Sequence, residues 1–541
     1  MRKPILLQPD YTAYQSYYQI KLPLEMEKLI PANDAVRLLS AFVEGMDLTE
    51  LYQTYDRVRK NQASPRQMLK IVIYAAMNGI FASRGIETSC QRDINYMYLL
   101  EGMPAPDHAT IARFISLHLS RCSKDLLKEV TMGLYELGEI SGKTIFIDGT
   151  KIEANANKYT FVWKKSVTKH LEKLFAKITA FVAECEVMYG LRIVYQDRIS
   201  RHTLNRLRKE LYEIKEEEGI VFVHGPGKRK TELQRSIETL EEYLTKLDEY
   251  TEKLRICGER NSYSKTDPDA TFMRMKEDAM LNGQLKPAYN LQHGVDAQYI
   301  TWVDVCQRPA DVMTLIPFLE DMEGYLPFKY TEIVADAGYE SEEAYVFLEK
   351  NGQEAYIKPQ NYEISKTRKY KLDIGRRENM TYLSEEDAYV CANGRKLLAV
   401  RERNRKNQRG YVSVETIYEC PDCGGCPDKT RCIRGNNCRI PLEERNKRVW
   451  GSKVMNAKRQ ETLERITTEY GTKLRMNRSI QAEGSFAVIK EDLGLRQYLY
   501  RGIGNVLAQS VVAAIAYNIN KLHFKIQGGR TGQFLTDLKS A

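Results

Sequence analysis

Three acidic residues have neighbours that could place them in one catalytic centre: Asp148, Asp336 and Glu483. Each aspartate follows a short apolar run that predicts a buried strand, and a glycine comes one or two residues later. A side chain at the carboxyl end of such a strand points into the crevice where open α/β sheets place their sites. Glu483 lies among apolar residues spaced as in a helix. Singly, an Asp-Gly pair is usually a turn and a helical glutamate is usually solvated, so the conjunction carries the prediction.

Carboxylates in this arrangement suit metal-dependent phosphodiester chemistry. Hard cations prefer oxygen ligands, so these carboxylates are expected to hold a pair of Mg²⁺ ions, with Mn²⁺ as a substitute. Paired ions activate a water or a 3′-hydroxyl and stabilise the leaving oxygen. Three basic residues near Glu483 are the predicted contacts to DNA phosphate oxygens: Arg478, Lys490 and Arg496.

The cysteines suggest a second metal site. Of 11 cysteines, five lie from Cys420 to Cys438, and an odd count in a cytosolic chain argues against a disulfide framework. Cys420, Cys423 and Cys426 follow one another at two-residue gaps in a Gly/Pro turn, and Cys432 lies six residues on. This spacing predicts a small metal knuckle, with zinc as the first choice and an iron–sulfur cluster as the alternative. Reduced cysteines in a polar loop are the remaining interpretation.

Several apolar and alternating runs predict the strands that must position the aspartates. Residues 144–147 form one, with residues 151–156 as its expected returning partner. Residues 289–296 and 299–306 are expected to pair antiparallel across a short Ala-Gln turn. Residues 332–336 form a further apolar strand, which ends in Asp336.

Helical patterns flank and interrupt these strands. Residues 165–256 are rich in Lys, Glu and Leu, and leucines in steps of four and three predict an antiparallel helical hairpin with its turn at residues 219–227. Short helices with tight turns around residues 60–120 suit a DNA-binding unit of helix-turn-helix type, although a generic helical bundle fits the pattern equally well. Residues 355–440 are expected to be irregular, and the chain to be helical again from residue 453.

One α/β core carrying an insertion accounts for this order of elements. The predicted divisions are 1–135, a helical N-terminal DNA-binding domain; 136–160, the first part of the core; 161–262, the helical hairpin insertion; 263–360, the second part of the core; 361–450, a basic segment with the Cys knuckle; and 451–541, a C-terminal helical part of the core that carries the catalytic Glu.

Composition bounds the class of protein. With 541 residues, 43% hydrophobic and 28% charged, the chain is neither largely disordered nor collagen-like. No apolar run reaches the roughly 18 residues needed to span a bilayer, and the N-terminus has no signal-peptide stretch. These observations predict a cytoplasmic protein without a membrane partner.

The positive charge is concentrated in two stretches. The net charge is only +9, but residues 395–409 carry seven basic residues against one acidic, and residues 439–478 carry 11 against five. Each stretch therefore has a local net charge of +6, and together they exceed the total for the chain. Because both flank Glu483 and the cysteines, contact with the DNA backbone is the favoured interpretation over a merely solvated face.

Motifs spread over nearly the whole chain carry a resemblance to a known family. The matching segments are 64–70, 74–79, 83–84, 106–114, 146–151, 266–270, 289–292, 335–339 and 478–490, followed by Gly494, Arg496 and 501–502. With these residues the chain resembles a DDE transposase of a bacterial insertion sequence, and it is most similar to the insertion-sequence 1182 family with its InsH-like N-terminal domain.

The resemblance implies a fold and an activity. The core is expected to be ribonuclease-H-like, with Asp148, Asp336 and Glu483 as the catalytic residues that bind Mg²⁺. The implied partners are double-stranded DNA of the terminal inverted repeats and of the target. Since two element ends must be cut together, a homodimer on DNA is expected, associated with the bacterial nucleoid. A DNA-binding protein without catalysis and a metal-dependent nuclease without strand joining are the alternatives.

One departure from the family pattern concerns the residues before Glu483. Related transposases often carry a tyrosine and then an arginine at fixed steps before the glutamate. Here the arginine slot, four before Glu483, holds Ser479, whereas Arg478 is one position off and Tyr470 is too far away. The step from Glu483 to Lys490 is kept.

Overall fold

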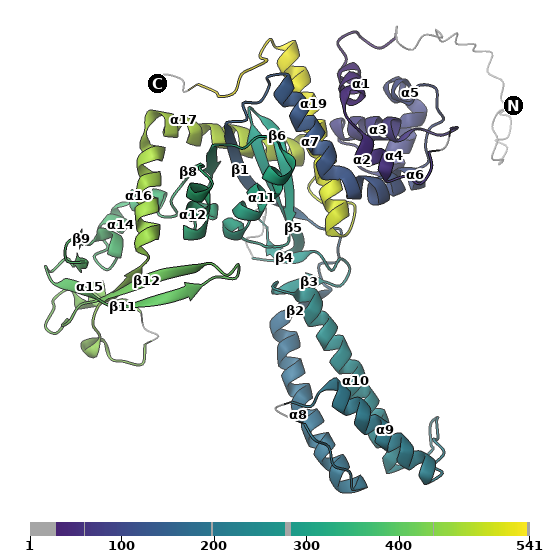
Figure 1. Cartoon of the computed structure of the whole chain (residues 1–541), viewed down its shortest axis with the longest axis vertical. Coiled ribbons are helices and arrows are strands. Elements are labelled where there is room, and N and C mark those ends of the chain that lie inside the picture. Colours follow the sequence, from purple (N-terminus) through teal and green to yellow (C-terminus); the bar gives the residue numbers. More distant parts are fainter. Residues whose placement is uncertain (1–28, 59, 196–197, 276–282, 436–437, 538–541) are drawn as a thin grey trace, which may run out of the picture.

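The computed structural model has a central sheet, with the N-terminal helices on one side of it and a lobe on the opposite side (Figure 1). A helical insertion projects from the sheet between them. The lobe contains a second sheet of five strands. It describes residues 29–541 apart from 59, 196–197, 276–282, 436–437 and 538–541. No helix in this described part of the chain is long and apolar enough to cross a membrane.

The central sheet is mixed and has six strands. They are β1 (Thr144–Glu153), β4 (Thr271–Arg274), β5 (Leu285–Asp296), β6 (Tyr299–Cys306), β7 (Glu332–Ala335) and β8 (Glu354–Ile357). The order is β4-β5-β1-β7-β8, with β6 also paired to β5. β5 runs antiparallel to β1 and to β6, whereas β7 and β8 run parallel to β1.

The predicted β5–β6 hairpin is confirmed. Its turn residues Ala297 and Gln298 both have positive φ, 51° and 71°, as a two-residue type I′ turn requires. The predicted returning partner at 151–156 is wrong, because β1 continues unbroken to Glu153 and pairs with β5 instead. Asp148-Gly149 therefore lies within a strand and forms no turn.

Helices cover the sheet and join it to the N-terminal region. They are α1 (Ala35–Gly45), α2 (Thr49–Gln53), α3 (Pro65–Met77), α4 (Ser83–Arg92), α5 (Ile94–Leu100), α6 (His108–Arg113), the π-helix η2 (Phe114–Leu119), α7 (Ser120–Glu136), α11 (Leu315–Tyr325), α12 (Glu342–Lys350), α16 (Lys453–Thr467), α17 (Glu469–Arg478), α18 (Gly484–Ala487) and α19 (Ile503–Gln527). One apolar cluster runs from Val36 in α1 through the strands to Leu522 in α19. The N-terminal helices and the sheet therefore share a core.

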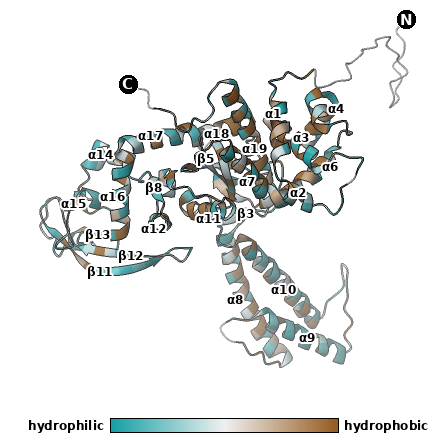
Figure 2. Cartoon of the chain, turned by 45° about the horizontal axis from the view of Figure 1, so that its top comes forward, coloured by the Kyte–Doolittle hydropathy of each residue, from teal (hydrophilic) through white to brown (hydrophobic). Residues whose placement is uncertain are grey.

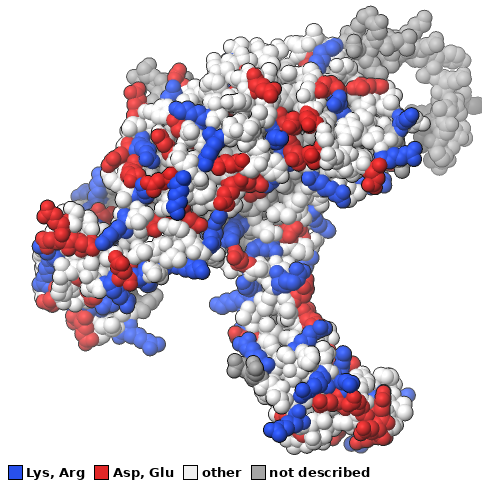
Figure 3. Space-filling model, viewed as in Figure 1, with Lys and Arg blue, Asp and Glu red and all other residues white. Residues whose placement is uncertain are grey.

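The insertion consists of three helices where a two-helix hairpin was expected. A short strand pair, β2 (Phe161–Trp163) with β3 (Ser262–Ser264), closes its base, and α8 (Lys164–Tyr189) leads away from it. The predicted turn lies between α9 (Arg201–Glu217) and α10 (Glu232–Cys257). The leucines of α10 pack against α8 and α9 in an apolar cluster separate from that of the sheet. At this base, the insertion, the sheet and the lobe surround a cavity of about 760 Å³, where Figure 3 shows the molecule hollowed.

The segment expected to be irregular is a second sheet, so that prediction is wrong. Its strands, in the order β13-β12-β11-β10-β9, are β9 (Thr381–Leu383), β10 (Ala388–Val390), β11 (Lys396–Lys406), β12 (Val412–Glu419) and β13 (Arg448–Gly451). Short helices α13 (Tyr362–Ser365), α14 (Arg368–Lys371) and α15 (Lys429–Cys432) accompany it. We call residues 366–452 the lobe. β11 misled a pattern-based prediction because most of this strand is hydrophilic and exposed (Figure 2).

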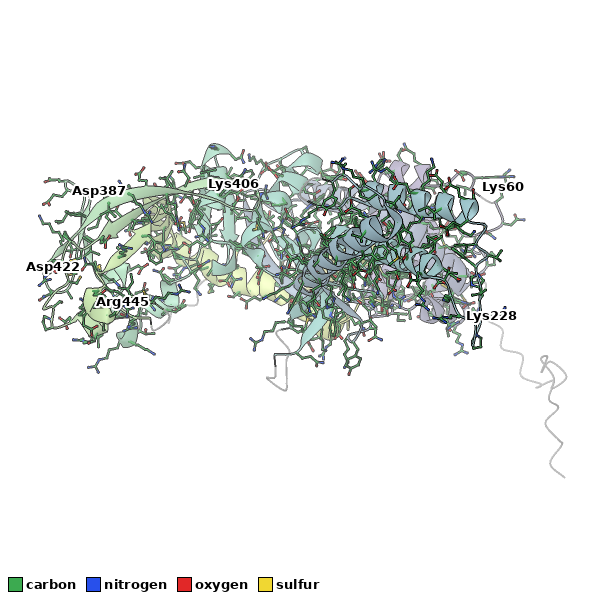
Figure 4. All side chains as sticks on the ribbon, turned by 90° about the horizontal axis from the view of Figure 1, so that it is seen from below. Lys60, Lys228, Asp387, Lys406, Asp422 and Arg445 are labelled. Atoms are coloured by element: carbon green, nitrogen blue, oxygen red, sulfur yellow. The ribbon has the colours of Figure 1, made fainter. Side chains whose placement is uncertain are left out.

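The tip of the β11–β12 ribbon is attached to the central part of the molecule. Arg409 lies 3.3 Å from Glu343, and Tyr411 donates a hydrogen bond of 2.8 Å to Glu342; both acidic residues belong to α12. Seen from below, Asp422 and Arg445 lie at the far end of the lobe, whereas Lys406 lies nearer the centre (Figure 4). The ribbon tip is therefore held against α12, while the opposite end of the lobe projects away from the centre.

Candidate active site

The three predicted carboxylates meet around one arginine. Nη1 of Arg478 lies 3.2 Å from Oδ2 of Asp148, and its Nη2 lies 2.8 Å from Oε1 of Glu483 and 4.0 Å from Oδ1 of Asp336. The Arg478 side chain is 13% exposed and that of Asp148 15%, whereas Asp336 and Glu483 are 43% and 55% exposed. Side chains from three distant parts of the chain are thus gathered at the rim of the sheet.

Strand pairing brings the two aspartates together. β1 and β7 are parallel neighbours, and Ile147 is in register with Ala335. The next residue on each strand is the aspartate, so Asp148 and Asp336 lie side by side. The chain leaves the sheet directly after Asp336 in a short 3₁₀ turn, η4 (Ala337–Tyr339). This exit leaves the Asp336 carboxylate at the open end of the strands.

A π-helical turn explains the departure before Glu483. Residues Ser479–Glu483 form a π-helix, η7, between α17 and α18. In an α-helix residues four apart share a face, whereas the wider π-turn brings residues five apart together. Arg478, five before Glu483, therefore occupies the place where the family pattern has an arginine four before. Tyr470 donates to Glu332 at 2.8 Å, in β7 and away from this cluster.

A buried histidine supports the glutamate. His293 on β5 is the pairing partner of Asp148 on β1, and its ring stacks on Phe486 with centroids 4.2 Å apart. Its Nδ1 lies 3.3 Å from the hydroxyl of Ser485. Burial lowers the pKa of His293 to about 3, so the ring is uncharged. The uncharged ring packs the turn after Glu483 against the strand next to Asp148.

A fourth acidic residue, Asp311, lies next to the glycines that follow the two aspartates, Gly149 and Gly338. Asn290 and Gln292 on β5 donate their side-chain amides to its Oδ1 at 2.7 and 3.1 Å. A Cβ on Gly149 would come within 2.9 Å of that oxygen and 2.3 Å of the Gln292 amide nitrogen, so only glycine fits after Asp148. A Cβ on Gly338 would lie 3.5 Å from the other oxygen. The Asp311 carboxylate thus packs against Gly149 within β1 and against Gly338 in the turn after Asp336.

Gln292 joins this carboxylate to the chain beyond Asp336. Its Oε1 accepts hydrogen bonds from the hydroxyls of Tyr339 and of Thr314, the latter at 3.2 Å. Gln292 and Tyr339 are fully buried, and burial, followed by the negative charges of Asp311 and Asp148, holds the pKa of Tyr339 well above its usual range. Tyr339 therefore stays a neutral donor, and the network fixes the backbone on both sides of the aspartates.

The predicted phosphate contacts divide between two places. Lys490, in the π-helix η8 (Val488–Asp492), and Arg496 line a cavity of about 210 Å³ together with Lys151 and Lys286. Arg496 also pairs with Glu491. Arg478 is not in this basic cavity, because its guanidinium is held by the carboxylates.

The donor set of the centre fits Mg²⁺ once Arg478 moves. Across the described residues, no three His, Cys, Asp or Glu side chains are grouped closely enough to hold a metal ion as they stand. At the carboxylates the reason is visible, because a guanidinium lies between them. Asp148, Asp336 and Glu483 offer only oxygen donors around a point that already holds positive charge, which is the chemistry a hard cation requires.

The four predicted cysteines are joined by a fifth. Cys420, Cys423, Cys426 and Cys432 line one small cavity, and Cys391, from the turn between β10 and β11, lines it too. Burial, followed by a hydrogen bond with Cys423, raises the pKa of Cys420 to about 11, so this thiol is protonated at neutral pH. Cys438, the fifth cysteine of the sequence cluster, is exposed and outside this cavity.

The additional residues of these sites carried weak signals in the sequence. Gln292 ends a segment that matched the family pattern, but its role as a buried bridge depends on tertiary contacts. Asp311 follows Pro-Ala after β6, a context shared by many loops. Cys391 lies 29 residues before Cys420 and gives no metal-binding spacing.

Two segments match models of transposase domains. Residues 390–523 match a transposase DDE domain, and residues 24–117 match a transposase domain of otherwise undescribed function, DUF772. The first match covers Glu483 and the cysteine cavity but neither Asp148 nor Asp336. No curated protein and no solved structure matches the chain. Both the N-terminal helices and the C-terminal half thus carry transposase domains.

Proposed function

We propose that this chain, which carries two transposase domains, binds the terminal inverted repeats of a mobile DNA element and cuts and joins its ends in a Mg²⁺-dependent reaction. The observation that carries the proposal is the meeting of Asp148, Asp336 and Glu483 at the rim of the sheet. The strand order, with β5 antiparallel to both β1 and β6, and with β7 and β8 parallel to β1, supports a ribonuclease-H-like core. The sequence motifs favour the insertion-sequence 1182 family in particular.

The three carboxylates would hold Mg²⁺, for which Mn²⁺ would substitute. Bound there, the metal supplies the Lewis acid for phosphodiester hydrolysis and strand transfer. The β1–β7 pairing fixes the two aspartates, and the His293–Phe486 stack fixes the turn that carries Glu483. With these residues held by the fold, the main reorganisation left for metal and DNA binding would be the movement of Arg478.

Basic residues beside the centre would bind and orient the DNA backbone. The cavity lined by Lys151, Lys286, Lys490 and Arg496 places positive charge next to the strand that carries Asp148. Arg478, released from the carboxylates by the metal, would become available to a phosphate in its place. Its planar guanidinium suits bidentate contact with phosphate oxygens.

Two further surfaces would extend the contact. β11 and the segment 439–478 hold the concentrated positive charge, and Arg403 and Arg405 on β11 are more than half exposed although both pair with Glu415. Backbone contacts of this kind give affinity without sequence preference. We assign recognition of the terminal repeat to residues 60–120, and a homodimer to the step in which both ends are cut.

A terminal-repeat oligonucleotide tests the assignment. With Mg²⁺ and a target duplex, the wild-type chain is expected to release a 3′-hydroxyl end and join it to the target, and Asp336→Asn is expected to bind the DNA but reduce both steps by at least 10³-fold, in the range of a lost catalytic group. Wild-type rates in Asp336→Asn would refute the site. Binding without nicking by the wild type would indicate a DNA-binding protein, and nicking without joining a nuclease.

A further inference from the structure

The cysteine cavity gathers sulfurs from separate stretches of the lobe. Cys420, Cys423 and Cys426 come from the loop after β12, Cys432 from α15, and Cys391 from the β10–β11 turn on the neighbouring strands. The cavity has a volume of only about 20 Å³, and none of the described His, Asp or Glu residues lines it. Five sulfur atoms around so small a space form a soft donor set, which thiophilic metals prefer.

The lobe needs more than its apolar core to stay folded. Among the described residues its buried apolar cluster consists of Met380, Tyr389, Leu397, Tyr418, Cys420, Cys423 and Val449. Two of these are cysteines of the cavity, so even fewer of the buried side chains stabilise the lobe by apolar packing alone. Units with so small a core usually depend on disulfides or a structural metal, and all the cysteines here are free.

Groups around the sulfurs are suited to thiolates. The backbone N–H of Lys447 donates to Sγ of Cys423 at 3.3 Å, and the Asn393 amide lies 3.6 Å from Sγ of Cys426. Three cationic side chains, Arg395, Lys429 and Lys447, also line the cavity. Donors and positive charge beside sulfur stabilise the net negative charge of an all-thiolate centre.

We propose that these cysteines hold one structural metal centre with four thiolate ligands, and that Cys391 is one of the four. The ion is a thiophilic one, zinc or the iron of an iron–sulfur cluster, because only sulfur is offered. As they stand, the sulfurs are not in ligating geometry. Binding must therefore remove the thiol protons and draw the sulfurs together, with Gly424 and Gly425 giving the loop between Cys423 and Cys426 its freedom. This proposal is independent of the reaction at Asp148.

Metal analysis of the full-length chain tests it without any DNA assay. We expect one zinc per chain, or iron with acid-labile sulfide and a visible absorption band, and these two outcomes identify the metal. The metal is expected to be lost in Cys391→Ser and kept in the matched control Cys438→Ser, because Cys438 is exposed outside the cavity. Metal-free wild-type protein, or an unchanged metal content in Cys391→Ser, would overturn the proposal.

A labelling experiment keeps the proposal testable if Cys391→Ser does not fold. The wild-type chain is treated with iodoacetamide, with and without prior chelation, and its peptides are analysed by mass spectrometry. Cys391 is expected to be protected until the metal is removed, whereas Cys438 is labelled in both samples. Equal labelling of Cys391 before and after chelation would exclude it as a ligand. The same map identifies which of the other four cysteines is not bound.

Discussion

Replacing Arg478 by glutamine gives a direct test of the idea that a metal must displace its guanidinium. Arg478 holds Asp148 in a mostly buried pair and Glu483 and Asp336 in more exposed ones. Exposed pairs contribute roughly 0.2–1 kcal/mol each, and losing one partner of a fully buried pair costs about 3–5 kcal/mol. The Asp148 pair is partly exposed, so its contribution must be reduced. We then estimate that the three ion pairs of Arg478 together stabilise the metal-free centre by about 2 kcal/mol.

That sum sets the expected change in metal affinity. A cation entering the wild-type centre must break these pairs, whereas in Arg478→Gln it does not. About 2 kcal/mol corresponds to roughly thirtyfold in the dissociation constant, so the variant is expected to bind Mn²⁺ or Mg²⁺ about ten- to thirtyfold more tightly. Without metal its three carboxylates repel one another, so its melting temperature is expected to fall and to recover on addition of Mg²⁺.

Isothermal titration of Mn²⁺ into the DNA-free protein measures this difference. Arg496→Gln is the matched control, because Arg496 forms its ion pair with Glu491 and, among the described residues, not with any of the three carboxylates. The control is expected to bind the metal as the wild type does. Unchanged or weaker binding by Arg478→Gln would refute the reasoning, because it would mean that the guanidinium organises the carboxylates for the metal.

Two further predictions concern carboxylates outside the three of the centre. Asp311→Ala leaves the Asn290 amide without its acceptor and the Gln292 amide with Asn290 alone, so we expect a loss of about 1–3 kcal/mol in the free energy of unfolding, measured in urea, and slower DNA cleavage at unchanged DNA affinity. Unchanged cleavage would show that Asp311 does not position the aspartates. Burial raises the pKa of Asp296 from 3.8 to about 7, so the folded state keeps this proton to higher pH than the unfolded state, and stability falls as pH rises from about 4 to 7. Asp296→Asn is expected to flatten this fall by up to roughly 4 kcal/mol in urea titrations at several pH values; an identical slope in the variant would contradict the assignment.

Local patterns predicted the elements whose causes are local. The Ala-Gln hairpin and the apolar strand before Asp336 both depend on residues close in sequence, and the structure has both of them. The three carboxylates were also found from their neighbours alone. Their convergence was expected from the two strand ends and from the family resemblance, although nothing in a single segment fixes which strands pair.

The errors arise where distant contacts decide the local structure. Asp148-Gly149 has the composition of a turn, yet the crowded side chain of Gln292 requires a glycine inside the strand. β11 lacks an alternating apolar pattern because most of its length faces solvent. A π-turn before Glu483 shifts Arg478 by one position, and counting along an α-helix cannot reveal such a shift.

The N-terminal helices and the sheet share one core. This has a consequence for the distance along the DNA between the proposed recognition sequence and the proposed cleavage site. A recognition unit on a flexible tether would reach cleavage sites at many distances from its binding sequence. Here the helices around residues 60–120 pack, through α19, into the same apolar cluster as β1 and β7. If residues 60–120 recognise the repeat and the three carboxylates cut the DNA, as proposed, the shared core fixes the distance between these two sites. An element end with base pairs inserted between its recognised sequence and its terminus would be bound and left uncut.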